Sequence, residues 1–256
     1  MKIITYSDLH LEFGTKFKPS INIDADLIIL AGDIINFNNC EALSDFLGDW
    51  KKPVLFVAGN HEYYTKQPMN QSEDVFKNFI YKKHSNIIWL KNSDFTVDEV
   101  HFFGGTMWTD FNKSNHNAMQ SAMVAMNDFK QILTENFNFL APQDTIKMHL
   151  EFKEKLINWL EKNHNKKRVV ISHHAPVLNP NSKYGNSKLQ PAFNSLDMVE
   201  IIEKYQPDLW IYGHTHECDN QIIGKTRIIS NQLGYPNNYG GFECDNFDEN
   251  GCKIEL

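Results

Sequence analysis

Seven residues with metal-binding side chains lie in five short segments of the sequence. They are Asp8, His10, Asp33, Asn60, His173, His214 and His216. Imidazole nitrogens and carboxylate or amide oxygens are atoms with which proteins bind divalent metal ions. A single histidine of this kind is more often a structural residue, so the prediction depends on the whole set. The sequence thus predicts a site that collects divalent cations.

Two of these segments carry a pair of donors separated by one residue. Asp8 is paired in this way with His10, and His214 with His216. Side chains two positions apart in an extended chain point to the same side. Each pair is therefore able to contact one ion.

Every donor segment follows a short apolar run rich in Ile and Val, which predicts a buried strand. The expected strands cover residues 2–6, 27–30, 54–57, 168–171 and 209–212. Amphipathic patterns predict helices at 40–50, 71–81, 115–132, 144–162 and 194–204. The alternation of strands and helices predicts an α/β protein with a parallel sheet, in which ligands bind beyond the carboxyl ends of the strands.

The remaining pattern concerns domain organisation. Short strands around 222–223 and 227–229, with turn residues at Gly224 and 233–241, predict an antiparallel portion after residue 205. No repeat or linker divides the chain, so residues 1–256 are predicted to form a single domain. Within it we expect a helical cap at about 107–150 and, beside His173, a loop at about 176–191 that forms a substrate rim.

Composition narrows the classes of partner. The 256 residues are 41% hydrophobic and 22% charged, with a formal net charge of −7, which is typical of a globular protein and argues against binding to long nucleic acid. No apolar run is long enough to span a membrane, and the first residues lack the pattern of a secretory signal. The four cysteines show neither zinc-site nor disulfide-framework spacing. We therefore expect a cytoplasmic protein; nothing in the sequence indicates an oligomeric state.

The donor segments form an ordered series of motifs. They are DLH at 8–10, GD at 32–33, GNHE at 59–62, SHHAP at 172–176 and GHTH at 213–216. This series resembles the motifs of the calcineurin-like metallophosphoesterase family, in the order in which that family carries them, and it spans most of the chain. Weaker segments, at 104–111, 127–128 and 231–235 and at His149, are similar to a bacterial branch of the family.

The resemblance implies a fold and a set of metal ligands. The fold would be a four-layer αββα sandwich, in which two mostly mixed sheets are flanked by helices. Asp33 would bridge two divalent metal ions, since a carboxylate offers one oxygen to each. The other six ligands would divide into two sets, one for each ion: Asp8, His10 and His216, and Asn60, His173 and His214. Mn²⁺ is the expected metal, with Fe, Zn²⁺ and Ni²⁺ as alternatives, because mixed nitrogen and oxygen ligation suits these ions better than Mg²⁺.

The resemblance also implies a reaction, the hydrolysis of a phosphate ester by a metal-bound hydroxide. His61 would be the catalytic residue that contacts the phosphate or protonates the leaving group, with Glu62 as a candidate to orient it. His174 has no assigned role, and Trp108, Asp110 and Asp128 are weaker candidates for the surroundings of the site.

Several alternatives stay open at the level of the sequence. The substrate is a small-molecule or protein phosphoester, and it is either a monoester or a small cyclic or dinucleotide diester; an open cleft would favour the diester and a closed cationic pocket the monoester. Residues that bind the substrate are not assigned, although Arg227 and Tyr235 are candidates. A catalytically weak scaffold of the same fold is the alternative from another class, and the complete ligand set argues against it.

Overall fold

Two β-sheets packed face to face form the centre of the protein. The computed structural model describes residues 1–14, 17–18, 23–163, 165–237 and 240–256. The first sheet has the strand order β11-β1-β2-β3-β4. Its strands are β1 (Lys2–Tyr6), β2 (Leu27–Ala31), β3 (Val54–Val57), β4 (Ile87–Trp89) and β11 (Ile254–Glu255). Strands β1 to β4 are parallel, and β11 runs antiparallel to β1.

The second sheet has the order β5-β6-β7-β8-β10-β9. Its strands are β5 (Ser93–Val97), β6 (Val100–Gly105), β7 (Lys167–Ser172), β8 (Leu209–Ile211), β9 (Asp219–Ile223) and β10 (Thr226–Ser230). Strands β6, β7, β8 and β10 are parallel, and β5 and β9 pair antiparallel at the two edges. After residue 205, antiparallel pairing is found in the β9–β10 pair and between β11 and β1, whereas β8 and β10 pair parallel.

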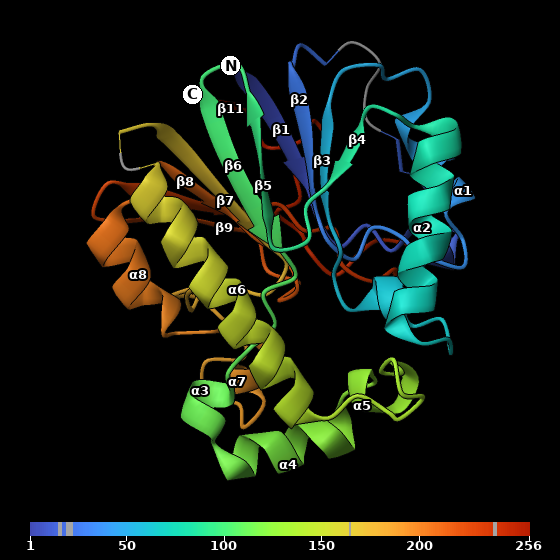
Figure 1. The fold of residues 1–256 in the computed structure, drawn as a ribbon, viewed down its shortest axis with the longest axis vertical. Coiled ribbons are helices and arrows are strands. Elements are labelled where there is room, and N and C mark those ends of the chain that lie inside the picture. Colours follow the sequence, from blue (N-terminus) through green and yellow to red (C-terminus); the bar gives the residue numbers. More distant parts are fainter. Residues whose placement is uncertain (15–16, 19–22, 164, 238–239) are drawn as a thin grey trace.

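Helices cover both outer faces (Figure 1). α1 (Glu41–Leu47) and α2 (Met69–Lys83) lie against the first sheet, and α6 (Pro142–Lys162) and α8 (Met198–Tyr205) lie against the second. The short elements gather at the end of the molecule opposite the two chain termini (Figure 1). They are α3 (Phe111–Ser114), α4 (His116–Ala125), α5 (Asp128–Gln131) and α7 (Gln190–Phe193). The four-layer αββα sandwich is thus confirmed.

Alternation along the strands produces these layers. In β2, Ile28 and Leu30 pack in the cluster beneath the helices, whereas Leu27 and Ile29 pack in the cluster between the sheets. All four side chains are fully buried. Because successive side chains of a strand point to opposite faces, a strand buried on both faces is apolar at every position. This is why the strands were recognisable in the sequence.

The structure differs from the prediction in one helix that is broken and in strands that were not predicted. The predicted helix at 115–132 is broken, since α4 ends at Ala125 and Met126 is extended before α5 begins at Asp128. The sequence pattern also did not predict β6, whose last two residues are glycines. A Cβ on Gly105 would lie 2.2 Å from Oδ1 of Asn92. The strand therefore needs glycine at this position, because another segment of the same chain approaches its backbone closely.

One structural finding concerns membranes. Within the described ranges, none of the helices combines the length and the apolar character that crossing a membrane requires.

Candidate metal centre

The predicted ligands lie at the carboxyl ends of five parallel strands. Asp8 and His10 follow β1, Asp33 follows β2, and Asn60 follows β3. From the other sheet, His173 follows β7, and His214 and His216 follow β8. All are buried except His216, which is partly exposed. Because the two sheets present the same ends of their parallel strands to one place, residues more than 200 positions apart meet there.

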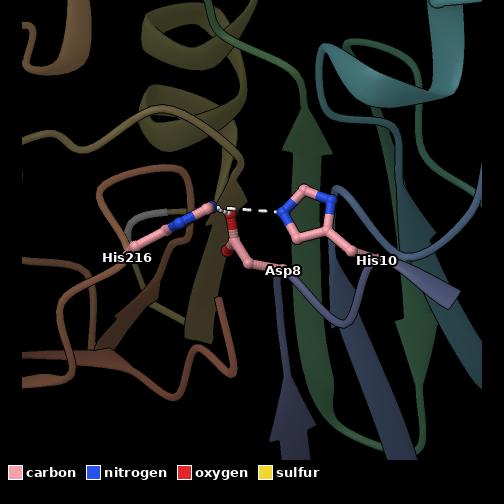
Figure 2. Close-up of side chains that lie close together, drawn as sticks. All are labelled: Asp8, His10 and His216. Carbon is pink, nitrogen blue, oxygen red and sulfur yellow. Dashed lines mark hydrogen bonds and ion pairs between the residues drawn. The ribbon is translucent and has the colours of Figure 1, made fainter. Parts of the chain in front are cut away.

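Asp8, His10 and His216 form the first group of donors (Figure 2). Nε2 of His10 lies 3.1 Å from Nε2 of His216, and the latter atom lies 3.4 Å from Oδ1 of Asp8. One donor atom from each residue lies within 4.8 Å of the others, which is a spacing that one metal ion can bridge.

The tautomers of the two histidines fit a metal ion. Glu12 accepts a hydrogen bond from Nδ1 of His10 at 3.2 Å, and Glu243 accepts one from Nδ1 of His216. A carboxylate at Nδ1 places the proton there and leaves the lone pair of Nε2 for a metal, the usual arrangement behind a metal-binding histidine. Once His216 has lost its second proton, two such lone pairs beside the carboxylate of Asp8 would suit one metal ion.

The second group consists of Asp33, His173 and His214, with Asn60 added through its amide oxygen. Oδ1 of Asn60 lies 3.0 Å from Nε2 of His173 and 3.1 Å from Nδ1 of His214. Oδ1 of Asp33 lies 3.3 Å from the same His173 nitrogen. His173 is held by a 3.0 Å hydrogen bond from Nδ1 to the carbonyl oxygen of Ala31, which leaves Nε2 for a metal.

Asp33 connects the two groups. Its carboxylate belongs to the group with His173 and His214, and it also lies within 4.8 Å of donor atoms of His10 and His61. Its oxygen Oδ1 is close to the backbone of Gly59, where a Cβ would lie only 2.1 Å away. Glycine at that position therefore makes room for the shared carboxylate.

Asn60 is oriented by Asp128, which lies at the start of α5. Nδ2 of Asn60 donates to Oδ1 of Asp128 at 2.8 Å, and the hydroxyl of Tyr64 donates to the same oxygen. The amide is thereby fixed with Oδ1 toward His173 and His214. Asp128, a weak candidate in the sequence, is thus a buried residue that supports Asn60.

His61 lies beside the predicted metal ligands, and three of its hydrogen bonds bear on its role. Its backbone N–H donates to Oδ1 of Asp33 at 2.9 Å, its Nδ1 lies 3.0 Å from Oε1 of Glu12, and its Nε2 lies 2.7 Å from the hydroxyl of Tyr235. Burial acts to lower the pKa of His61, but the charges of Asp33 and Glu12 outweigh it and raise that pKa. The structure thus favours a protonated imidazole, as a leaving-group acid requires.

Glu62 does not orient His61, contrary to the sequence-based hypothesis. Its carboxylate accepts backbone N–H bonds from Gly59 at 2.7 Å, Asp33 at 3.0 Å and Ile34 at 2.8 Å. It therefore holds together the two turns that carry Asp33 and Asn60. The orienting role belongs to Glu12, whose one oxygen serves both His10 and His61.

Three other candidates have structural roles. His174 packs on His214, with ring centroids 4.1 Å apart, and burial holds its pKa well below the ordinary value, so it is a neutral packing residue. His149 hydrogen-bonds to Asp197 at 3.1 Å, away from the ligands. Asp110 caps α3 by accepting from two backbone N–H groups.

Sequence reasoning missed two carboxylates, Glu12 and Glu243. Glu12 stands two residues after His10, a position that repeats the spacing of Asp8 and His10 and that offered a usable signal. Glu243 lies 27 residues after His216 in an irregular segment, where no local pattern marks it. Both act on the Nδ1 atoms of histidines and not on the metal directly.

Metal binding is expected to release about two protons per chain at pH 7. Burial acts to lower the pKa of His173, but Asp33 outweighs it and raises that pKa to about 10. In the same way, burial is outweighed at His216 by Asp8 and Glu243, which raise its pKa to about 9. A histidine with a raised pKa is protonated at pH 7 and must lose its proton to bind a metal. The affinity for Mn²⁺ should therefore increase as the pH rises toward 9–10.

Calorimetric titration of the metal-free protein with Mn²⁺, in two buffers of different ionisation enthalpy, measures this release. His10 and His214 have lowered pKa values and contribute no protons at pH 7. If the heat of Mn²⁺ binding were the same in both buffers, no protons would be released, and the assignment of His173 and His216 as ligands would be contradicted.

The fold and the site define a class of protein, the metal-dependent phosphoesterases. The chain belongs to the calcineurin-like phosphoesterase family, whose model matches residues 1–218, and it is accordingly a hydrolase of phosphoester bonds. The metals of this family are divalent, in agreement with the donor groups described above.

Particular relatives extend this finding. The chain is 30% identical over 270 residues to an uncharacterized protein of Acanthamoeba polyphaga mimivirus, covering 94% of each. It is 26% identical over 241 residues to a UPF0046 protein of Caenorhabditis elegans, covering 90% of this chain and 69% of that one.

Solved structures show the same fold. Phosphopantetheinyl hydrolase from Mycobacterium tuberculosis aligns with a TM-score of 0.66 at 17% identity, over 92% of this chain and 90% of the other. A dimetal phosphatase from Danio rerio aligns with a TM-score of 0.50 at 12% identity, over 90% and 86%.

Proposed function

We propose that the protein hydrolyses a small-molecule phosphate ester at a dinuclear metal centre. The observation that carries this proposal is the position of Asp33, whose carboxylate is shared between two groups of donors while its Oδ1 accepts from the backbone of His61. One ion would be held by Asp8, His10 and His216, and the other by Asn60, His173 and His214, with Asp33 between them. Two divalent cations, when bound, supply Lewis acidity and lower the pKa of coordinated water toward about 7.

The residues of the chain supply the rest of the chemistry. Asp33 and Asp8 give the centre two buried negative charges, which offset part of the repulsion between the cations. His61 holds a proton at Nε2 and donates it to the leaving oxygen as the ester bond to phosphorus breaks. Glu12 keeps the imidazole of His61 in place through Nδ1, and Tyr235 contacts Nε2 until the substrate takes its position.

A diester is favoured over a monoester by the surroundings of His61. An open cleft of about 590 Å³ begins there, and among its described lining residues none is lysine or arginine. A monoester carries one more negative charge than a diester and gains from a cationic pocket. The size of the cleft suits a small molecule better than a protein segment.

Hydrolysis of p-nitrophenyl phosphate and of its bis ester tests this proposal. We expect activity that depends on added metal, with Mn²⁺ the most effective among Mn²⁺, Fe²⁺, Zn²⁺ and Ni²⁺, and a higher kcat/KM for the bis ester. The His173→Ala variant serves as the control, since the loss of a metal ligand should remove the activity with either ester. Activity that survives a chelator and the His173→Ala substitution would exclude a metal-dependent reaction.

A further inference from the structure

The cleft beside His61 lies on the leaving-group side of the proposed centre. Its lining includes His61 and Glu12 and none of the seven predicted metal ligands. A leaving-group acid must face the alcohol part of the ester, because that part receives its proton. The cleft is therefore the place where the alcohol part of the substrate would lie.

Aromatic side chains border the cleft on both sides of His61. The ring centroid of Phe13 lies 6.2 Å from that of His61, and the ring centroid of Tyr64 lies 4.3 Å from it. Phe13 is 55% exposed although it follows the buried His10 by only three residues, and its ring meets Tyr235 edge-on at 5.8 Å. An exposed aromatic ring at the mouth of an active site offers a face on which a planar group can stack.

Two amide side chains in the lining are available for hydrogen bonds. Asn127, just before α5, and Gln131, at its end, both line the cleft. Among the described residues, neither side-chain amide has a hydrogen-bond partner within the protein, whereas the amide of Asn36 is used on both its atoms. Each free amide offers an acceptor oxygen and two donor hydrogens, which match the mixed edge of a heteroaromatic ring.

The charges of the lining disfavour a second anionic group. Glu12 is the one acidic residue among the described lining residues, and it is engaged with His10 and His61. None of these residues is lysine or arginine, and the proton of His61 is assigned to the leaving oxygen. A polyphosphate or a phosphorylated sugar in the cleft would find neither lysine nor arginine for its additional charge, and an aliphatic alcohol would leave the ring of Phe13 unused. A neutral planar group with hydrogen-bonding edges uses both features.

We propose that the alcohol part of the substrate carries a neutral heteroaromatic ring, as a nucleoside does, which stacks on Phe13 and hydrogen-bonds to Asn127 and Gln131. This inference rests on the proposed phosphoesterase function, because it identifies the leaving-group side through His61. It assigns substrate specificity to the segment after β1 and to α5.

Two pairs of substrates test the inference. Adenosine 5′-monophosphate is compared with ribose 5-phosphate, and adenosine 3′,5′-cyclic monophosphate with the counterpart in which a methoxy group replaces the base. For the pair that is cleaved, kcat/KM should be at least about tenfold higher with the base than without it. In the Phe13→Leu variant this ratio should fall about tenfold, the loss expected when one ring is removed from a base-stacking site. Phe137→Leu, at a phenylalanine that is 67% exposed outside the cleft, should keep the ratio.

A binding measurement separates failure of this inference from failure of the proposed function. Calorimetry with adenosine 5′-monophosphate and metal-free protein should show binding that weakens about tenfold in Phe13→Leu and persists in Phe137→Leu. Equal rates for the two members of each pair, in a protein that cleaves p-nitrophenyl esters, would overturn the inference alone. Absence of any hydrolysis would overturn the proposed function. If adenosine 5′-monophosphate then also bound equally well to Phe13→Leu and to the unchanged protein, the inference would be overturned as well.

Discussion

Replacing His61 with alanine is expected to lower kcat by about 10²- to 10⁴-fold, the range that a positioned general acid contributes, and to leave the metal content per chain unchanged. His61 contacts Glu12 and Tyr235 through its ring, and only its backbone contacts Asp33, so the substitution keeps that last hydrogen bond. Steady-state kinetics with the preferred p-nitrophenyl ester and elemental analysis of the same preparation measure the two quantities.

Leaving-group dependence distinguishes proton donation from simple contact with the phosphate. The loss in His61→Ala should be larger for an alkyl ester than for a p-nitrophenyl ester, because p-nitrophenolate leaves readily without a proton. Glu12→Gln should show the same trend with a smaller loss, since it weakens the hold on Nδ1 of His61. His116→Ala, at an exposed histidine, is the matched control. Equal losses for both esters would remove His61 from the role of acid, and full residual activity would remove it from catalysis.

The donor residues were predictable because each is local to a strand end. Ile28 to Leu30 are buried on both faces of the strand, and Asp33 follows after only Ala31 and Gly32. The sequence itself therefore marks where the buried strand ends and the polar turn begins. Parallel strands bring such turns to one edge of a sheet, which is a general property of α/β folds. His10 and His216 follow strands of different sheets, so their sharing of one ion was expected only because the resemblance to the family implied it.

The supporting residues were less predictable because they act across the fold. Glu62 was assigned to His61 because the two are adjacent in sequence. In the structure its carboxylate instead accepts from four backbone N–H groups, three in the turn after β2 and one, of Gly59, in its own turn. Glu243 reaches His216 from a segment without strand or helix periodicity. Such contacts depend on how loops pack, which residue type and spacing do not encode.

The strands β5 and β6 illustrate the limit for the fold. β5 is mostly exposed and β6 ends in two glycines, so neither has the continuous apolar pattern that marked β1, β2 and β3. Close packing of Gly104 against Leu90 and Val57, where a Cβ would lie 3.0 Å from each, requires this composition. The requirement is set by residues of the facing sheet and is visible only after the two sheets have been packed together.

Asp33→Asn is expected to have the largest effect on metal content, because the substitution keeps the shape of the side chain and removes the charge shared by both donor groups. The loss of an outer-shell partner alone typically weakens metal binding by 10–100-fold, so the loss of a shared ligand should weaken both sites by at least about 100-fold. Elemental analysis should find fewer than two ions per chain, and kcat/KM should fall by about 10³-fold or more.

Asp110→Asn is the matched control for this prediction, since Asp110 is a buried aspartate that caps α3 and belongs to none of the donor groups. It should retain two ions and most of the activity. Circular dichroism spectra of the two variants distinguish loss of metal from unfolding.

The number of protons released on Mn²⁺ binding is an independent check on Asp33. The charge of Asp33 is the main cause that raises the pKa of His173, so the substitution should lower that pKa. His173 would then already be neutral in more of the molecules at pH 7, and fewer protons should be released on metal binding. A variant Asp33→Asn that binds two ions with unchanged proton release would show that Asp33 does not connect the two groups, and the dinuclear centre would then have to be abandoned.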